Sequence, residues 1–172
     1  MSTRPMPTQV ERFLGDDDFI VSKTDLQGRI LYGNRSFIEL SGYTEAELLG
    51  EPHNIIRHPD MPRGVFKLLW DTIQGGHEVW AYVKNLSRDG GFYWVLANVT
   101  PSYDEADTLV GYYSVRRKPE PRCIKTIGGI YQSMLAREQG RSAREAAELS
   151  LQFLNEVLAS KGISYEEFVL SL

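Results

Sequence analysis

The order of its predicted elements places this chain in the α+β class, as a five-stranded antiparallel sheet with short helices over one face. An N-terminal hairpin is predicted over 19–33, with strands at 19–22 and 29–33 and a turn at 25–28. Three later stretches are rich in aromatic and β-branched residues and are separated by turn sequences, which predicts three more strands. They span 79–86, 92–103 and 109–117.

Short helices are predicted between the two groups of strands. One covers 36–41, and a second begins at the capping box Thr44–Glu47 and ends at Gly50. Asp60 and Pro62 open a longer helix, in which apolar residues recur at helical spacing up to residue 73. These helices would pack over one face of the sheet.

The chain divides into three segments: an arm or cap over 1–18, an α+β domain over 19–118 and a helical extension over 119–172. The acidic run 16–18 belongs either to a solvated arm or to the end of a short helix over 10–14. In the extension, a helix from Ser142 to Gly162 carries a wide apolar stripe. That stripe must be covered by the chain's own domain, by a second copy or by a partner.

The composition excludes several classes of function. The chain has 172 residues, 42% of them hydrophobic, which suffices for a buried core without disulfides or a structural metal. A net charge of -4 does not favour binding to nucleic acid or to an anionic membrane. The single cysteine, Cys123, excludes an internal disulfide and is compatible with a reducing cytoplasm. No apolar run approaches the length of a membrane span, so we expect a cytoplasmic protein.

Motifs of the common enzyme classes are missing from the sequence. There is no phosphate-binding P-loop, no dinucleotide-binding glycine pattern, no zinc-type histidine motif and no nucleophile elbow. We therefore expect neither an enzyme nor a metal site.

Several short motifs together resemble the PAS domain family. The general signals are Thr24-Asp25, Gly28, Asn34, Ser41-Gly42-Tyr43 and Gly50. The stretch from Gly50 to Pro62 is more specific and resembles the PAS domain of bacterial aerotaxis receptors. Further residues add to this resemblance, namely Phe66, Trp70, Lys84-Asn85, Tyr93-Trp94-Val95 and Gly111-Tyr112. The resemblance implies a PAS fold, bound FAD and the reporting of redox state or oxygen supply to a partner protein.

Two departures limit what the resemblance implies. Aerotaxis receptors continue into a membrane anchor and a signalling coiled coil, and neither pattern occurs in this sequence, so we expect only the sensor part. Photoreceptor-type flavin PAS domains carry a cysteine that forms a light-driven adduct, whereas 54–58 reads Asn-Ile-Ile-Arg-His. We therefore do not expect adduct photochemistry.

The resemblance also implies which polar side chains would hold the cofactor. Asn85 would bond the carbonyl and imide edge of the flavin ring, where an amide both donates and accepts. Arg57 and the helix start near Asp60 would bind phosphate, although Asp60 also suits a plain N-cap. His58 would lie in the cofactor cleft or serve as a buried hinge residue. Asn34 would bond the cofactor or occupy a turn.

Aromatic and strand residues complete the predicted site. Trp70 and Trp94 would line or stack on the ring, or belong to the plain core. Ser114 would hydrogen-bond near the reactive ring nitrogen, on a strand that leads into the C-terminal helices.

Alternatives remain open at the level of sequence. One is a haem-binding gas sensor with His53 or His58 as iron ligand. Another is a cofactor-free interaction module. We expect a homodimer with an unidentified signalling partner.

Overall fold

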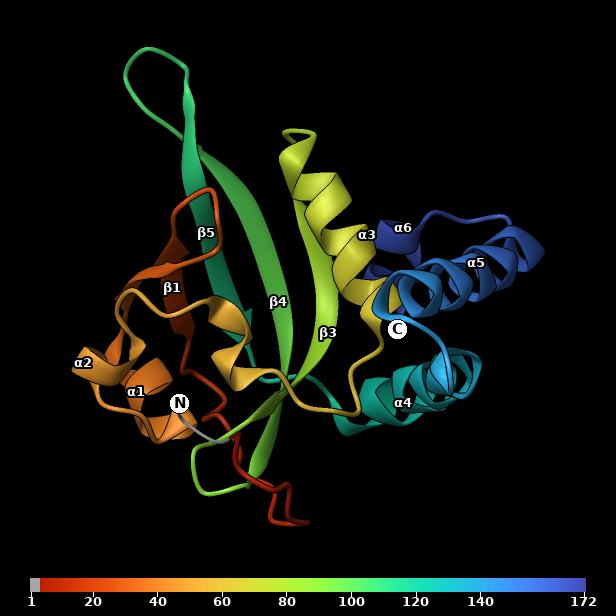
Figure 1. The fold of residues 1–172 in the computed structure, drawn as a ribbon, viewed down its shortest axis with the longest axis horizontal. Helices are drawn as coiled ribbons and strands as arrows, with labels where there is room; N and C mark the ends of the chain where they lie inside the picture. The colour runs from red at the N-terminus through yellow and green to blue at the C-terminus, as the bar shows by residue number, and fades with distance from the viewer. Residues whose placement is uncertain (1–3) are drawn as a thin grey trace.

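The computed structural model describes residues 4–172 and confirms the α+β class and the five-stranded antiparallel sheet (Figure 1). The sheet order is β2-β1-β5-β4-β3, so β2 and β3 are its edges. The strands are β1 (Ile20–Thr24), β2 (Ile30–Gly33), β3 (Val79–Leu86), β4 (Phe92–Tyr103) and β5 (Leu109–Arg117). The first strand begins one residue and ends two residues later than predicted. It is paired with β5 over its whole length, from Ile20 opposite Arg116 to Thr24 opposite Tyr112.

The first hairpin turn forms as its sequence predicts. Gly28 adopts φ +78°, and its N–H donates to the carbonyl of Asp25. The Asp25 carboxylate accepts from the backbone N–H groups of Gln27 and Arg29. Glycine is required here because a left-handed φ is costly for other residues.

Four short helical elements cover the inner face of the sheet. They are α1 (Arg35–Ser41), α2 (Glu45–Leu48), the 3₁₀ turn η1 (His53–Ile56) and α3 (Arg63–Gln74). The predicted capping box at Thr44 is present, with both of its reciprocal hydrogen bonds.

The start of α3 differs from the prediction. Pro62, not Asp60, is its N-cap residue, and it supplies no side-chain hydrogen bond. The C-terminal extension provides the missing acceptors instead. Arg63 N–H donates to Glu138 Oε1 at 2.7 Å, and Gly64 N–H donates to Ser150 Oγ at 2.9 Å. The first donors of this helix are therefore already used and are not free for a phosphate.

The extension forms α4 (Pro121–Glu138), α5 (Ala143–Lys161) and α6 (Tyr165–Ser171), which lie beyond β3 on the side opposite to α1 and α2 (Figure 1). The capping boxes at Ser142 and Ser164 are both present. The buried face of α5 packs against α3 and α4, so the chain's own domain covers the apolar stripe. A Cβ on Gly64 would lie 2.4 Å from Ser150 Oγ, which is why glycine stands at this crossing.

The extension and the loop before α3 also close the free edge of the sheet at β3. Tyr131 Oη donates to the carbonyl of Tyr82 at 2.6 Å, and Lys84 N–H points to Met61 Sδ at 3.2 Å. Both Tyr82 and Lys84 lie on β3, whose other side pairs with β4. An edge strand with occupied backbone groups cannot recruit another strand.

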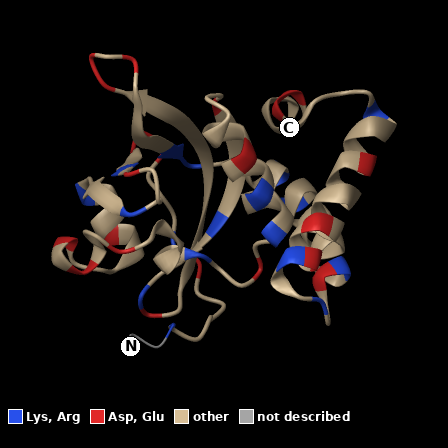
Figure 2. Ribbon diagram, turned by 45° about the horizontal axis from the view of Figure 1, so that its top comes forward, with Lys and Arg blue, Asp and Glu red and all other residues tan. Residues whose placement is uncertain are grey.

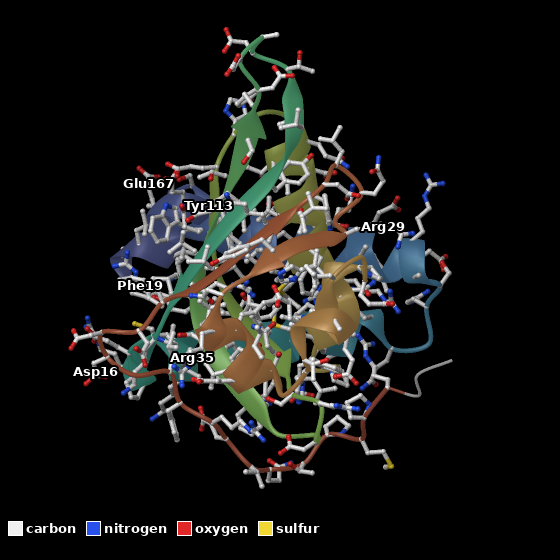
Figure 3. All side chains as sticks on the ribbon, turned by 90° about the vertical axis from the view of Figure 1, so that its left-hand side faces the viewer. Asp16, Phe19, Arg29, Arg35, Tyr113 and Glu167 are labelled. Carbon is white, nitrogen blue, oxygen red and sulfur yellow. The ribbon has the colours of Figure 1, made fainter. Side chains whose placement is uncertain are left out.

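The N-terminal arm is extended, and no helix forms over 10–14. Its backbone bonds to the β3–β4 turn through Thr8, Arg12 and Val10, which contact Gly90 and Phe92. Figure 3 shows Phe19, where the arm enters β1, on the same side of the sheet as Tyr113 and opposite to Arg29. In the described range, no helix combines the length and the apolar character that a membrane crossing requires.

Candidate functional site

A cavity of about 190 Å³ lies between the inner face of the sheet and the helices η1 and α3. Its walls are mainly apolar and aromatic, as is usual for small-molecule sites. The lining apolar and aromatic side chains are Ile56, Phe66, Leu69, Trp70, Ile73, Val83, Ala97, Val99 and Tyr112. Polar residues enter it from three strands and from the segment 52–57.

Two buried side chains with unused donors line this cavity. Asn85 is 3% exposed and Arg116 is 2% exposed. Six buried side-chain nitrogen or oxygen atoms lack a partner in residues 4–172. Three of them are Asn85 Nδ2, Arg116 Nε and Arg116 Nη1. Since an unpaired buried donor costs about 1–3 kcal/mol, such a concentration indicates a ligand with acceptor atoms.

Arg116 lies at the centre of a small hydrogen-bonded group. Its Nη2 donates to Ser22 Oγ, and Ser22 Oγ lies 3.0 Å from His53 Nε2. Its guanidinium also stacks over the Phe37 ring at 4.8 Å. Because Ser22 already accepts from Arg116, its own proton is available to a neutral His53.

The electrostatics of this group favour an anionic or acceptor-rich ligand. Burial, with the Arg116 charge as second cause, lowers the pKa of His53 to about 3. Burial lowers the pKa of Arg116 to about 10, so the guanidinium is still charged at neutral pH. Within the described chain Arg116 has no carboxylate partner. A buried cation of this kind is stabilised when a ligand supplies the missing negative charge.

Four of the eight predicted site residues line the cavity. Asn85 and Ser114 enter from the sheet, Arg57 from the residue after η1, and Trp70 from α3. The Trp70 ring packs edge-on against Tyr112 at 5.6 Å and lies against Gly28, where a Cβ would come within 2.9 Å. Their convergence agrees with the prediction, and their contact with a cofactor stays a prediction.

Two of the other predicted residues have structural roles away from the cavity. The side chain of Asn34 caps α1 by accepting from Phe37 N–H, and it also bonds Val21 N–H and the Phe19 carbonyl. Trp94 points to the opposite face of the sheet and stacks on Tyr131 at 6.2 Å. The prediction that these two reach a cofactor in this cavity is corrected here. Side chains alternate between the two faces along β4. Val95 and Ala97 point to the inner face, so Trp94 points to the outer face.

His58 and Asp60 also lie outside the cavity lining. His58 is buried, accepts from Asp60 N–H through Nδ1 at 3.0 Å and leaves Nε2 without a partner. Burial, followed by the charge of Lys84, lowers its pKa to about 4. The Asp60 carboxylate pairs with Lys84 Nζ at 2.7 Å. The Asp60–Lys84 ion pair thus joins the loop before α3 to β3, and a hinge role for His58 stays a prediction.

The cavity residue Arg116 was not predicted from the sequence, and His53 was considered there only as a haem ligand. Tyr112, Ser114 and Arg116 alternate along β5 and therefore share one face. Arg116 lies two residues after the predicted site residue Ser114 and therefore on the same face of β5. A charged residue near the end of a strand usually faces solvent, so the pattern alone gave no reason to place Arg116 inside.

Neither a metal site nor a reactive thiol is associated with the cavity. Over residues 4–172 no three histidine, cysteine or acidic side chains gather as metal ligands would. The only cysteine of the sequence, Cys123, is buried in α4 and is not part of the lining.

Comparison with known proteins gives consistent matches. The family described as "PAS fold" matches residues 30–116. The aerotaxis receptor of Escherichia coli (strain K12) is 39% identical over 144 residues, which are 84% of this chain but 28% of the receptor. The chain thus spans just over a quarter of that relative.

Solved light-oxygen-voltage domains share the fold. One such domain gives a TM-score of 0.57 at 20% identity, covering 67% of this chain and 86% of that one. The light state of the blue-light photoreceptor Aureochrome1 gives 0.55 at 25% identity, covering 66% of this chain and 90% of that one.

Proposed function

Because this chain belongs to the PAS fold family, we propose that its cavity binds a flavin, FAD, and that the protein reports redox state or oxygen supply to a signalling partner. The observation that carries the proposal is that two buried side chains with unpaired donors, Asn85 and Arg116, line an apolar cavity. The identity of 39% to an aerotaxis receptor supports this choice among PAS ligands.

The residues present fit a flavin ring. Its flat aromatic system suits the walls formed by Phe66, Trp70 and Tyr112, and its carbonyl edge suits the free donors of Asn85 and Arg116. A bound flavin would supply a reversible redox centre inside the domain. Arg57, at the cavity's edge, would contact phosphate.

Arg116 would make the site sensitive to reduction. A fixed buried cation with two unused N–H groups stabilises whichever ligand state holds more negative charge beside it. As that charge increases, Arg116 would tighten its bonds to the ligand and loosen its bond to Ser22. Since Ser22 also contacts His53, the change would reach β1 and η1 together.

The signal would leave the cavity through α3 as well as through β5. Phe66, Leu69, Trp70 and Ile73 of α3 line the cavity. The first donors of α3 are held by Glu138 and Ser150 of the C-terminal extension. A shift of α3 therefore changes contacts that the extension makes, which is the surface we propose for a partner or a second copy.

The light-driven adduct of photoreceptor domains is not part of this proposal, because no cavity residue is a cysteine. A haem ligated by His53 is less well supported. His53 Nε2 is occupied by Ser22, and the Arg116 charge lies beside it and would oppose a metal cation.

The first test is the visible absorption spectrum of the purified protein, with chromatography of the chromophore released by denaturation. We expect a flavin spectrum that bleaches with dithionite and returns in air, and released FAD. Asn85→Ala should lose most of the flavin, whereas Asn98→Ala, on the same sheet and bonded only to Glu78, should retain it. A Soret band, or a protein that stays colourless with excess FAD, would contradict the proposal.

A further inference from the structure

A second hollow, which we call the basic groove, adjoins the cavity and is partly built by the C-terminal extension. Its volume is about 530 Å³, and Asn54, Arg57, Phe66 and Trp70 line both spaces. The other residues of the groove come from α3 and from the first turns of α5. They are Arg63, Lys67, Ala143, Arg144, Ala147 and Glu148.

The groove carries an excess of positive charge. Its lining includes Arg57, Arg63, Lys67 and Arg144, against the single carboxylate of Glu148. Figure 2 shows that charged positions gather on the helices and loops while the strands are largely uncharged. Four basic residues and one acidic residue thus line a hollow next to an apolar cavity.

Arg57 takes no part in the ion pairs of the groove, and its Nη2 donates to the Met61 carbonyl at 3.4 Å. Arg144 pairs with Glu148 at 3.1 Å, and Lys67 pairs with Asp71 at 3.0 Å. Arg57 has no such partner in the described range; its guanidinium lies over the Phe66 ring at 4.2 Å. Burial, followed by the charges of Arg63 and Arg4, lowers its pKa to about 10, with Glu138 opposing. These cations repel one another until an anion enters.

We propose that α5 completes the cofactor site, and that the basic groove binds the phosphate-bearing nucleotide end of a flavin dinucleotide between α3 and α5. This inference rests on the proposed function, because it assigns the part of the ligand that extends beyond the ring. Arg57 stands where the two spaces meet and would contact the phosphates from one side. Arg144 would contact them from the other.

The side chains, not the helix end, make this site. The N-terminal donors of α5 are already used by its own capping box, in which Ser142 and Glu145 bond each other's backbone. The position of α5 depends on the crossing at Gly64, whose N–H bonds Ser150. Binding of the dinucleotide and docking of α5 on α3 must therefore strengthen each other, since such coupling is reciprocal.

The test compares the affinities of FAD, FMN and riboflavin for the full chain after its flavin has been removed. Wild type should bind FAD at least about tenfold more tightly than riboflavin. Arg144→Gln should weaken the binding of FAD about tenfold and leave the affinity for riboflavin unchanged. Arg141→Gln is the matched control, because it removes an equal charge three residues away from an exposed position outside the groove.

A second variant tests the position of α5 without removing charge. Gly64→Ala should displace α5, because the new Cβ would meet Ser150. The variant should bind FAD more weakly and riboflavin as tightly as wild type does. In wild type, FAD should slow backbone hydrogen exchange in α5 more than riboflavin does.

The outcomes separate the two proposals. Normal riboflavin binding with FAD affinity unaffected by Arg144→Gln would overturn the role of α5 and leave the flavin site intact. Failure to bind any of the three flavins would overturn both.

Discussion

The cavity and the β3 edge satisfy their polar groups in opposite ways. At the edge, the Tyr82 carbonyl accepts from Tyr131, and the first donors of α3 are taken by Glu138 and Ser150. In the cavity, Asn85 and Arg116 keep three buried donors unused. The edge leaves one buried donor unpaired, His58 Nε2 in the loop before α3, whereas the cavity has three such atoms on two side chains.

This difference separates stability from function along one sheet. Buried polar groups are nearly always paired in native proteins, so unpaired ones mark places where folding free energy has been given up for another role. The contrast predicts that changes at the edge destabilise the protein. Changes in the cavity should stabilise the empty protein and harm ligand binding.

The largest effect we expect is the response to acid. His53 and His58 have pKa values lowered to about 3 and about 4, so the unfolded state binds more protons below pH 6.5. Their contribution to stability is complete above pH 6.5 and falls as the pH drops toward 4. At pH 4.5 the loss should reach at most about 5 kcal/mol, measured by urea denaturation.

The helix caps should respond in a different pH range. The Ser142 and Ser164 capping boxes lower the pKa values of Glu145 and Glu167, so these carboxylates lose their contribution only below about pH 4.5. His53→Gln and His58→Gln should each flatten the curve between pH 6.5 and 4.5. An unchanged slope in both variants would contradict the assignment.

The crossing of α3 and α5 gives the next largest effect. In Gly64→Ala, the new Cβ would meet Ser150 Oγ at 2.4 Å and Leu151 N at 2.5 Å. Overpacking of this kind costs about 1–3 kcal/mol, which thermal or urea unfolding would measure. Gly129→Ala on α4, where a Cβ meets nothing within 4 Å, is the control and should be neutral or stabilising.

A change of opposite sign is expected in the cavity. Arg116→Met removes a buried unpaired cation and keeps most of the side-chain volume, so the flavin-free protein should gain about 1–3 kcal/mol. The same variant should bind flavin poorly. If Arg116→Met destabilised the empty protein, the cavity would be part of the ordinary core and the contrast would fail.

The smallest effect concerns one hydrogen bond at the sheet edge. Tyr131→Phe leaves the Tyr82 carbonyl without its partner and should cost about 1–2 kcal/mol in urea denaturation. Tyr113→Phe is the matched control and should change stability little, because Tyr113 alternates with the cavity residues Tyr112 and Ser114 on β5 and so faces away from the cavity. Equal losses of unfolding free energy in the two variants would show that the hydrogen bond from Tyr131 to Tyr82 adds no stability at the sheet edge.

Local signals made most of the fold predictable. The turn at Asp25–Gly28 and the capping boxes at Thr44, Ser142 and Ser164 depend on neighbours within four residues, and all of them form. The wrong assignments involve distant partners. Asp60 is not an N-cap because Glu138 and Ser150, far along the chain, supply the acceptors of α3.

Prediction of the site depended on the family resemblance, which implied Asn85 and Arg57 as cofactor-binding residues. Both line the cavity, and their contact with a cofactor stays a prediction. Asn34 suits either a ligand or a helix cap, and sequence could not choose between these roles. Arg116 was missed because its burial depends on Phe37 and Ser22, which approach it only in the folded sheet.

The most direct test of the account is a titration of the flavin-free protein with FAD, followed by flavin fluorescence, in wild type, Arg116→Gln and Arg117→Gln. Arg116 faces the cavity, while Arg117 lies on the same strand and contacts Phe19 and Trp80 outside it. We predict that Arg116→Gln weakens the binding of FAD roughly 10- to 100-fold, since hydrogen bonds to a charged group contribute about 1.5–3 kcal/mol. Arg117→Gln should leave the FAD affinity unchanged. Equal affinities in all three proteins would contradict the claim that the unpaired buried donors of this cavity are there for a flavin.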